Sequence, residues 1–289
     1  MWYASVMNGY DTLVETLSRF EHSLASLKPI TTVGELAKES GYSVHHFSRL
    51  FFSHTSLHVK EYLQGRLLTS IFEQAATDNA PFATLAALYG FRDYETFYRA
   101  CKTRWDKNPT QIREQGLAEE QKQQRIYPQR KEPTITLVGE LVQKEAINLC
   151  GLSFFVGPET KTFHTIWAQF SRYEHLIEHT LEEGTTYQYS SWADEPMPGM
   201  SVLCAKAIEE AWLEEELFTI RKVPPATYVR FVHTQDVMLI QEAYQYIYGT
   251  YFARSPLQPL GNWEFQRYPQ GRSEIEIYIP VRTGTPLPS

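Results

Sequence analysis

Two stretches of the sequence repeat one pattern: residues 31–51, TTVGELAKESGYSVHHFSRLF, and residues 81–101, PFATLAALYGFRDYETFYRAC. In each, a Leu-Ala pair is followed by a glycine. A phenylalanine comes six or seven residues after the glycine, and an arginine lies two positions beyond it. This order predicts a short helix, a turn at the glycine and a second helix, which is the arrangement of a helix-turn-helix. The repetition predicts two such units, joined by one helix over residues 59–77.

The charge of the chain is distributed unevenly. The 289 residues carry a net charge of -7, which by itself argues against a nucleic-acid-binding protein. Residues 1–131, however, contain 16 Lys and Arg against 14 Asp and Glu, whereas residues 132–289 contain 11 against 20. This asymmetry predicts an acidic module joined to one that tolerates phosphate groups. With 43% hydrophobic residues, a chain of this length can form two domain cores.

A polar, glutamine-rich segment separates the two halves. Residues 117–134 read LAEEQKQQRIYPQRKEPT, and we interpret them as a linker. The linker divides the chain into a domain over residues 8–116 and a domain over residues 135–285.

The second domain is predicted to contain one order of elements twice. A strand, an amphipathic helix and a strand pair are expected over residues 146–156, 163–180, 185–193 and 201–208. The same order recurs over residues 217–232 (one strand, bent at Pro224-Pro225), 236–252, 263–268 and 274–281. The expected fold class is therefore an all-α first domain with two helix-turn-helix units, followed by an α+β domain of two pseudo-symmetric strand-helix-strand-strand halves.

Several classes of site find no support in the sequence. The three cysteines are widely spaced, which favours neither a disulfide framework nor a metal site. His175 and His179 have helical spacing, but no third metal ligand is evident. No nucleophile elbow, phosphate loop or nucleotide fingerprint occurs. We therefore expect no catalytic residue, metal or cofactor, and, without a signal peptide or a membrane-spanning apolar run, a cytoplasmic protein.

The outward faces of the two second helices are the candidates for reading DNA. Arg49 and Arg99 occupy equivalent positions, and an arginine on a helix in the major groove can donate two hydrogen bonds to guanine. The alternative is an ordinary solvated helix face, which the duplication disfavours. The residues expected to approach DNA are His45, His46, Ser48, Arg49, Tyr94, Glu95, Tyr98, Arg99 and Lys102.

Residues 31–114 resemble the DNA-binding domain of AraC/XylS-type transcription regulators. The resemblance rests on Leu36-Ala37, Gly41-Tyr42-Ser43, Phe47 to Phe51, Tyr62, Arg66-Leu67, Leu85-Ala86, Gly90-Phe91, Phe97, Arg99 and Pro109. It implies target promoters and contact with RNA polymerase, and we expect the domain to read DNA as a monomer. Two departures stand out: Ser56 and Asp106 lie where the family often has glycine, and Cys101 replaces an aromatic residue.

Residues 146–282 resemble GyrI-like effector-binding domains. The matching stretches are residues 218–224, 228–231, 265–268 and 275–281. The resemblance implies a pocket between the two halves for an amphipathic, often cationic, aromatic molecule. The family's usual acid is replaced here by Gln266, while Glu264, two residues earlier, points to the same strand face. The pocket is expected to involve Trp167, Tyr189, Trp192, Glu264, Gln266 and Tyr278, although core packing is the simpler role for most of these aromatic residues.

Together these features predict a ligand-responsive transcription regulator, an activator of the AraC type with a GyrI-like effector-binding domain. Two alternatives from other classes concern the second domain. It could hydrolyse small reactive compounds, with Glu264 as general base, or it could be a protein-interaction module fused to the DNA-binding domain.

Overall fold

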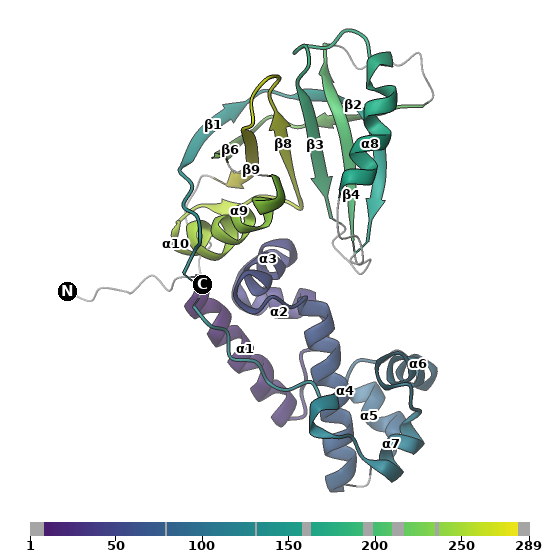
Figure 1. The fold of residues 1–289 in the computed structure, drawn as a ribbon. Coiled ribbons are helices and arrows are strands. Elements are labelled where there is room, and N and C mark those ends of the chain that lie inside the picture. The colour runs from purple at the N-terminus through teal and green to yellow at the C-terminus, as the bar shows by residue number, and fades with distance from the viewer. Residues whose placement is uncertain are drawn as a thin grey trace, which may run out of the picture. The chain divides into compact units, whose positions relative to one another are not determined.

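The computed structural model describes residues 9–282, apart from residues 79, 131, 158–162, 193–198, 210–216 and 235–236. The chain divides into two compact units, Met1–Glu132 and Pro133–Ser289. The division falls inside the segment interpreted as a linker. The first unit is helical and the second is a sheet with helices against it (Figure 1), so the predicted fold class is confirmed.

The first unit contains the two predicted helix-turn-helix units, α2–α3 and α5–α6, with α4 connecting them (Figure 1). Its elements are α1 (Gly9–Ala25), α2 (Val33–Ser40), α3 (Val44–Thr55), α4 (Val59–Asp78), α5 (Phe82–Leu88), α6 (Tyr94–Trp105), α7 (Pro109–Gln115) and the 3-10 turn η1 (Glu119–Gln121).

Side-chain caps start both second helices. Ser43 accepts a hydrogen bond from the backbone N–H of His46 at the start of α3. Asp93 does the same for Thr96 at the start of α6. Each cap satisfies a donor that the helix itself leaves unpaired. The turn preceding each helix therefore fixes where its exposed face begins.

The helix α4 contributes to the cores of both helix-turn-helix units. Phe51 of α3 lies 5.5 Å, between ring centroids, from Tyr62 of α4. In the second unit, Phe97 of α6 lies 5.9 Å from Phe72 of α4. Cys101 is completely buried, and burial raises the pKa of its thiol to about 12, so it acts as a small core residue.

Both second helices end on a residue in the left-handed conformation. Ser56 (φ 60°) follows α3, and Asp106 (φ 54°) follows α6. These are the positions where the sequence departs from the glycine of similar domains. Side chains other than glycine are strained there, so the fold keeps its helix ends at a cost in stability.

The second unit contains one nine-stranded sheet in the order β1-β6-β9-β8-β3-β4-β2-β5, with β7 paired to β9. Its elements are β1 (Gly139–Lys144), β2 (Ile147–Val156), α8 (His164–Tyr173), η2 (Glu174–Leu176), β3 (Thr186–Ser191), β4 (Met200–Ile208), β5 (Thr219–Val223), β6 (Ala226–His233), η3 (Val237–Leu239), α9 (Ile240–Tyr246), the π-helical turn η4 (Ile247–Tyr251), α10 (Phe252–Arg254), β7 (Gln258–Pro259), β8 (Trp263–Tyr268) and β9 (Ile275–Arg282).

The two predicted halves are β2-α8-β3-β4 and β6-α9-β8-β9, and they join where β3 pairs antiparallel with β8. The single bent strand expected over residues 217–232 is wrong. Pro224 and Pro225 instead separate β5, which pairs with β2, from β6, which pairs with β1 and β9. Prolines cannot donate to a strand ladder, so the chain leaves one edge of the sheet there. The edge strand β1 was not predicted.

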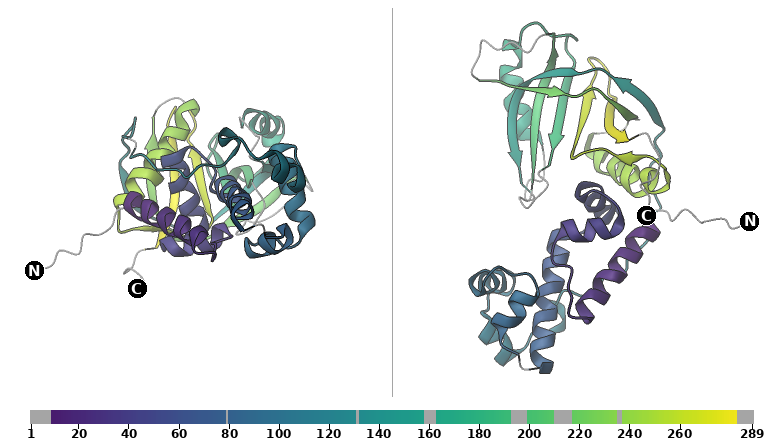
Figure 2. Two further views of the ribbon diagram at one scale, coloured as in Figure 1. Left: turned by 90° about the horizontal axis from the view of Figure 1, so that it is seen from below. Right: turned by 180° about the vertical axis from the view of Figure 1, so that it is seen from behind.

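The sheet is strongly curved (Figure 2), and its two faces carry different cores. On the outer face, α8 packs on one apolar cluster around Phe170 and Cys204, while α9, η4 and α10 pack on another around Phe231 and Ile277. A third cluster, which includes Tyr228 and Tyr278, fills the inner face. The β3–β8 pair therefore lies at a seam between two helix-covered cores.

Relieving the strain after α3 should stabilise the first unit. We expect Ser56→Gly to raise the free energy of unfolding by about 0.5–1 kcal/mol, and Asp106→Gly to have a smaller effect because Asp tolerates this conformation better. Thermal unfolding of the full chain measures both changes. The control Gly41→Ala makes the opposite exchange. Gly41 has φ 74° and open space around it, so this variant should have a lower thermal midpoint because of backbone strain alone. A midpoint unchanged or lowered by Ser56→Gly would contradict the expectation.

Candidate DNA-binding and effector sites

Arg49 is the long cationic side chain on the face of α3 that is expected to approach DNA. His45, Ser48 and Arg49 are all half-buried. The Ser48 hydroxyl donates to the carbonyl oxygen of Val44 at 2.7 Å, which turns this side chain toward its own helix. Arg49 is therefore the residue of α3 best suited to reach a base or a phosphate.

His46 does not lie on this face, which corrects the prediction that it contacts DNA. Its side chain is 1% exposed, and its ring lies 4.2 Å from that of Tyr42. His46, Leu50 and His54 follow one another at helical spacing and form a buried stripe of α3. The adjacent histidines thus point in different directions, and His46 supports the helix from its buried side.

The α6 face is more open. Arg99 and Glu95 form an ion pair at 3.7 Å in which the two side chains are 64% and 73% exposed, and Tyr94 is also exposed. Because exposed pairs of this kind contribute little, Arg99 can exchange Glu95 for a DNA acceptor at small cost. Tyr98 is half-buried beside them. Lys102 donates to the carbonyl oxygen of Asp106 at 3.2 Å, so it caps the far end of α6.

Arg92 is a candidate that sequence reasoning missed. It precedes the helix cap Asp93, pairs with it at 2.9 Å, and its side chain is 81% exposed. A cation at the start of a reading helix is well placed for a phosphate. Its position between Phe91 and Asp93, directly before α6, was the available signal.

Buried polar residues mark the seam between the halves of the second unit. Glu264 and Gln266 on β8 pair in register with Ser190 and Gln188 on β3, and all four side chains are buried. Glu264, 2% exposed, accepts a hydrogen bond of 2.9 Å from the hydroxyl of Tyr248 in η4. The predicted sharing of one strand face by Glu264 and Gln266 is confirmed.

Aromatic side chains connect this seam to both helices. Trp167 of α8 donates to Gln188 Oε1 at 3.2 Å, and its ring lies 5.1 Å from that of Tyr268. On the other side, Gln266 Nε2 donates to the Tyr244 hydroxyl at 2.6 Å, and Tyr268 donates to Gln266 Oε1. Of the predicted effector residues, the structure brings together Trp167, Glu264 and Gln266.

The seam also contains residues that sequence reasoning missed. Tyr244 and Tyr248 are four residues apart, and their rings stack at 6.4 Å. Gln188 and Ser190 alternate along β3 with the aromatic residues Tyr187 and Tyr189, which is a signal that the sequence offers. We call Trp167, Gln188, Tyr244, Tyr248, Glu264, Gln266 and Tyr268 the seam cluster.

Tyr189 and Tyr278, two other predicted effector residues, lie on the inner face instead. Their neighbours along the strands, Gln188 and Ile277, point to the outer face, and both tyrosines belong to the inner apolar cluster. The Tyr278 hydroxyl donates to Glu276 at 2.9 Å. Trp192 lies beyond β3, where its backbone N–H donates to the carbonyl oxygen of Asn262 at 2.9 Å.

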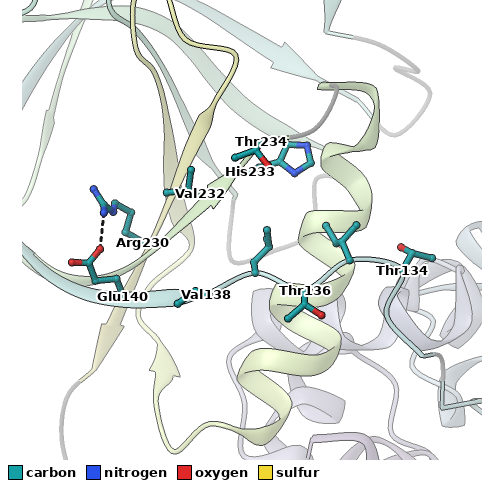
Figure 3. A pocket seen from close by; sticks show the side chains of 10 residues that line it. Thr134, Thr136, Val138, Glu140, Arg230, Val232, His233 and Thr234 are labelled. Atoms are coloured by element: carbon teal, nitrogen blue, oxygen red, sulfur yellow. Dashed lines mark hydrogen bonds and ion pairs between the residues drawn. The ribbon is translucent and has the colours of Figure 1, made fainter.

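A separate hollow of about 570 Å³ lies where the chain before β1 diverges from the end of β6. Figure 3 shows the Arg230–Glu140 ion pair at one end and His233 with Thr234 at the other. The ion pair measures 2.6 Å. None of the predicted effector residues lines this hollow.

In the described part of the chain, no group of three or more His, Cys, Asp or Glu side chains could hold a metal ion. No helix within the same ranges is long and apolar enough to cross a membrane.

The buried position of His46 predicts a pH dependence. Burial lowers its pKa to about 3, whereas an imidazole in the unfolded chain titrates near 6.5. Below pH of about 6.5 the unfolded state therefore binds a proton that the folded state excludes, and stability is lost as the pH falls toward 3. We expect the free energy of unfolding to fall less for His46→Phe than for the wild type when the pH is lowered from about 7 to about 5. Urea unfolding at each pH measures this free energy. The control is His22→Phe, an exchange at an exposed histidine. Parallel losses in all three proteins would contradict the buried, neutral state of His46.

Comparison with known proteins identifies both units. Residues 36–115 match the family described as a helix-turn-helix domain, and residues 140–281 match the family described as integron-associated effector binding protein. The multiple antibiotic resistance protein MarA of Escherichia coli is 31% identical over 102 residues, which cover 35% of this chain and 78% of MarA. The probable transcription factor PqrA of Proteus vulgaris is 29% identical over 84 residues, or 29% of this chain and 69% of PqrA.

Two solved structures are also similar. One is SAV2435 bound to tetraphenylphosphonium (14% identity, TM-score 0.41, 50% of this chain and 94% of that chain). The other is EcmrR in the EcmrR–DNA complex in EcmrR-RPo (13% identity, TM-score 0.40, 91% and 82%). At these values they add nothing to the assignment, which rests on the two family matches and on MarA. The chain belongs to the AraC-type, MarA-like DNA-binding transcription regulators and carries a GyrI-like effector-binding domain as its second unit.

Proposed function

We propose that this regulator activates promoters in response to a small amphipathic cation. The first unit would bind promoter DNA through α3 and α6. The second unit would bind the effector at the seam cluster and act as a sensor rather than as a hydrolase. The observation that carries the effector proposal is the burial of the Glu264 carboxylate beside Tyr248, among aromatic side chains from both helices.

The DNA part of the proposal rests on two equivalent helices. Each has twelve residues, a side-chain cap at its start and an arginine at the sixth position, Arg49 or Arg99. An α-helix fits the major groove, and two of them in one chain can enter successive groove segments on one face of DNA. Because the family consists of transcription regulators, RNA polymerase is the expected partner at the promoter.

The effector part rests on the electrostatics of Glu264. A carboxylate that is 2% exposed lies in a medium of low dielectric, where its attraction for a cation is stronger than in water. Tyr248 donates its hydroxyl to Glu264, and its ring stacks on that of Tyr244, so aromatic rings, which can attract cations, lie next to this residue. Gln266, at the position of the family acid, is already engaged with Tyr244 and supplies only neutral hydrogen bonds. The charge of the effector would therefore pair with Glu264.

Coupling between effector and promoter requires two states of the protein. An effector can shift their equilibrium only by its difference in affinity for them. Tyr244 and Tyr248 make contacts on both sides, to the strand β8 through Gln266 and Glu264 and to each other. A cation that pairs with the Glu264 carboxylate in place of Tyr248 would change the position of the helix formed by α9 and η4. We propose that this change is the signal.

Replacing Arg49 or Arg99 by alanine distinguishes a contact with a base from a contact with a phosphate. For a base contact, Arg49→Ala or Arg99→Ala should cost roughly 1–3 kcal/mol and relax specificity at one position of the site. For a phosphate contact, the same change should weaken binding to all sequences and lower the salt dependence. The measurement is duplex binding at two salt concentrations, with sites first selected from a random-sequence pool. The control Arg254→Ala removes an exposed arginine of the second unit. Unchanged binding in both variants would exclude α3 and α6 as the reading helices.

Replacing the buried carboxylate should abolish discrimination by charge. Tetraphenylphosphonium and tetraphenylborate have nearly the same shape and opposite charge. We expect only the cation to raise the thermal midpoint of the full chain, and Glu264→Gln to remove that rise. Glu178→Gln, at an exposed glutamate, is the matched control. Equal shifts from both ions would show an uncharged site, and a shift that persists in Glu264→Gln would place the cation elsewhere.

A further inference from the structure

The segment interpreted as a linker is packed against the first unit. Residues 117–128 leave α7, run along α4 and reach the start of α1 (Figure 1). We call these residues the strap. The strap has little regular structure apart from η1, so its position depends on contacts with the helices.

The two ends of the strap are fixed on different helix-turn-helix units. Near its start, the indole Nε1 of Trp105, at the end of α6, donates to the carbonyl oxygen of Gln121 at 2.8 Å. At its far end, the hydroxyl of Tyr10 in α1 donates to the carbonyl oxygen of Pro128 at 2.8 Å. The helix α1 packs against α2 and α3. The strap therefore connects the second helix-turn-helix unit to the first by a route separate from the α4 backbone.

A buried charge network holds the middle of the strap. Arg66 of α4 donates to the carbonyl oxygen of Gln123 at 2.9 Å and pairs with Glu21 of α1 at 2.7 Å. The side chains of Arg66 and Glu21 are 12% and 10% exposed. The Tyr62 hydroxyl donates to Glu21 at 2.9 Å and accepts from the backbone N–H of Ile126 at 3.4 Å. Buried charges of this kind are costly to separate, so α1, α4 and the strap hold each other in place.

Gly65 leaves room for the strap. It lies inside α4, where glycine costs about 1 kcal/mol relative to alanine. A Cβ at this position would lie 2.9 Å from Cβ of Gln123 and 2.8 Å from the guanidinium of Arg104. One helical turn further along α4, Thr69 Oγ1 accepts from the backbone N–H of Gln123 at 3.0 Å. The sequence of α4 thus gives up helix stability where the strap passes closest.

We infer that the strap braces the two helix-turn-helix units at one separation and thereby determines which spacing between two DNA half-sites the protein reads. The inference rests on the proposed reading of DNA by α3 and α6. A single helix can bend, whereas α4 together with the strap connects the two units along two lines. Tyr10, Thr69 and Gly65 are then positioning residues, remote from the reading faces.

The test compares three variants with the wild type as full chains. Gly65→Ala should displace the strap while favouring the α-helix, and Thr69→Val removes one strap hydrogen bond without changing side-chain size. Gln64→Ala, at an exposed neighbour on α4, is the control. Trypsin cleavage after Lys122 and Arg125 reports displacement of the strap, and selection from a random-sequence duplex pool reports half-site sequence and spacing.

We expect the wild type and Gln64→Ala to enrich two half-sites at one spacing. Gly65→Ala and Thr69→Val should be cleaved faster in the strap and should enrich the same half-sites over several spacings. Faster cleavage with a single, unchanged spacing would overturn the brace. Unchanged cleavage in Gly65→Ala would overturn the role of the glycine gap. Failure of the wild type to enrich any sequence would instead count against DNA reading itself, so the two failures are distinguishable.

Discussion

The antiparallel pairing of β3 with β8 is the contact on which the second unit depends. Each half of that unit has three strands and one helix layer, and the pair joins them into one sheet. The same register places Gln188 opposite Gln266 and Ser190 opposite Glu264. Without this pairing the two helix-covered cores would be separate, and the buried carboxylate would lie at an open edge. Architecture and candidate site therefore share one cause.

In the first unit, buried polar side chains hold helices together. Its two cores share α4, and each is closed by aromatic side chains. Between them, Arg66, Glu21 and Tyr62 replace apolar packing by a charged network. Such a network favours one arrangement of its partners over others that an apolar surface would tolerate. Under the proposed reading of DNA by α3 and α6, that restriction would keep the two helices in one arrangement.

Local signals in the sequence were sufficient for the first unit. The capping box at Thr32, the caps at Ser43 and Asp93 and the proline at the start of α7 each act within a few residues, so they fix the helix starts without contacts to distant parts of the chain. Non-local relations were not accessible. The separation of β5 from β6 at Pro224-Pro225 and the existence of β1 depend on which strand pairs with which.

The same distinction governs the candidate sites. Alternation along one strand correctly placed Glu264 and Gln266 on one face, but it could not relate β8 to β3 or β9, so Tyr189 and Tyr278 were grouped with residues on the other face. His46 was misplaced because an adjacent pair of histidines says nothing about which of the two is buried.

The π-helical turn at Ile247–Tyr251 has a consequence for comparing this protein with its relatives. A π turn contains one more residue than the α turn it replaces, so Tyr244 before it and Phe252 after it are out of step by one position with an uninterrupted α-helix. An alignment without gaps to a relative that has a plain α-helix here would match one end of this helix and shift the other, and the tyrosine that contacts Glu264 lies within the turn itself. Equivalent residues in relatives are therefore to be assigned separately on the two sides of the turn, from the strand that each side contacts.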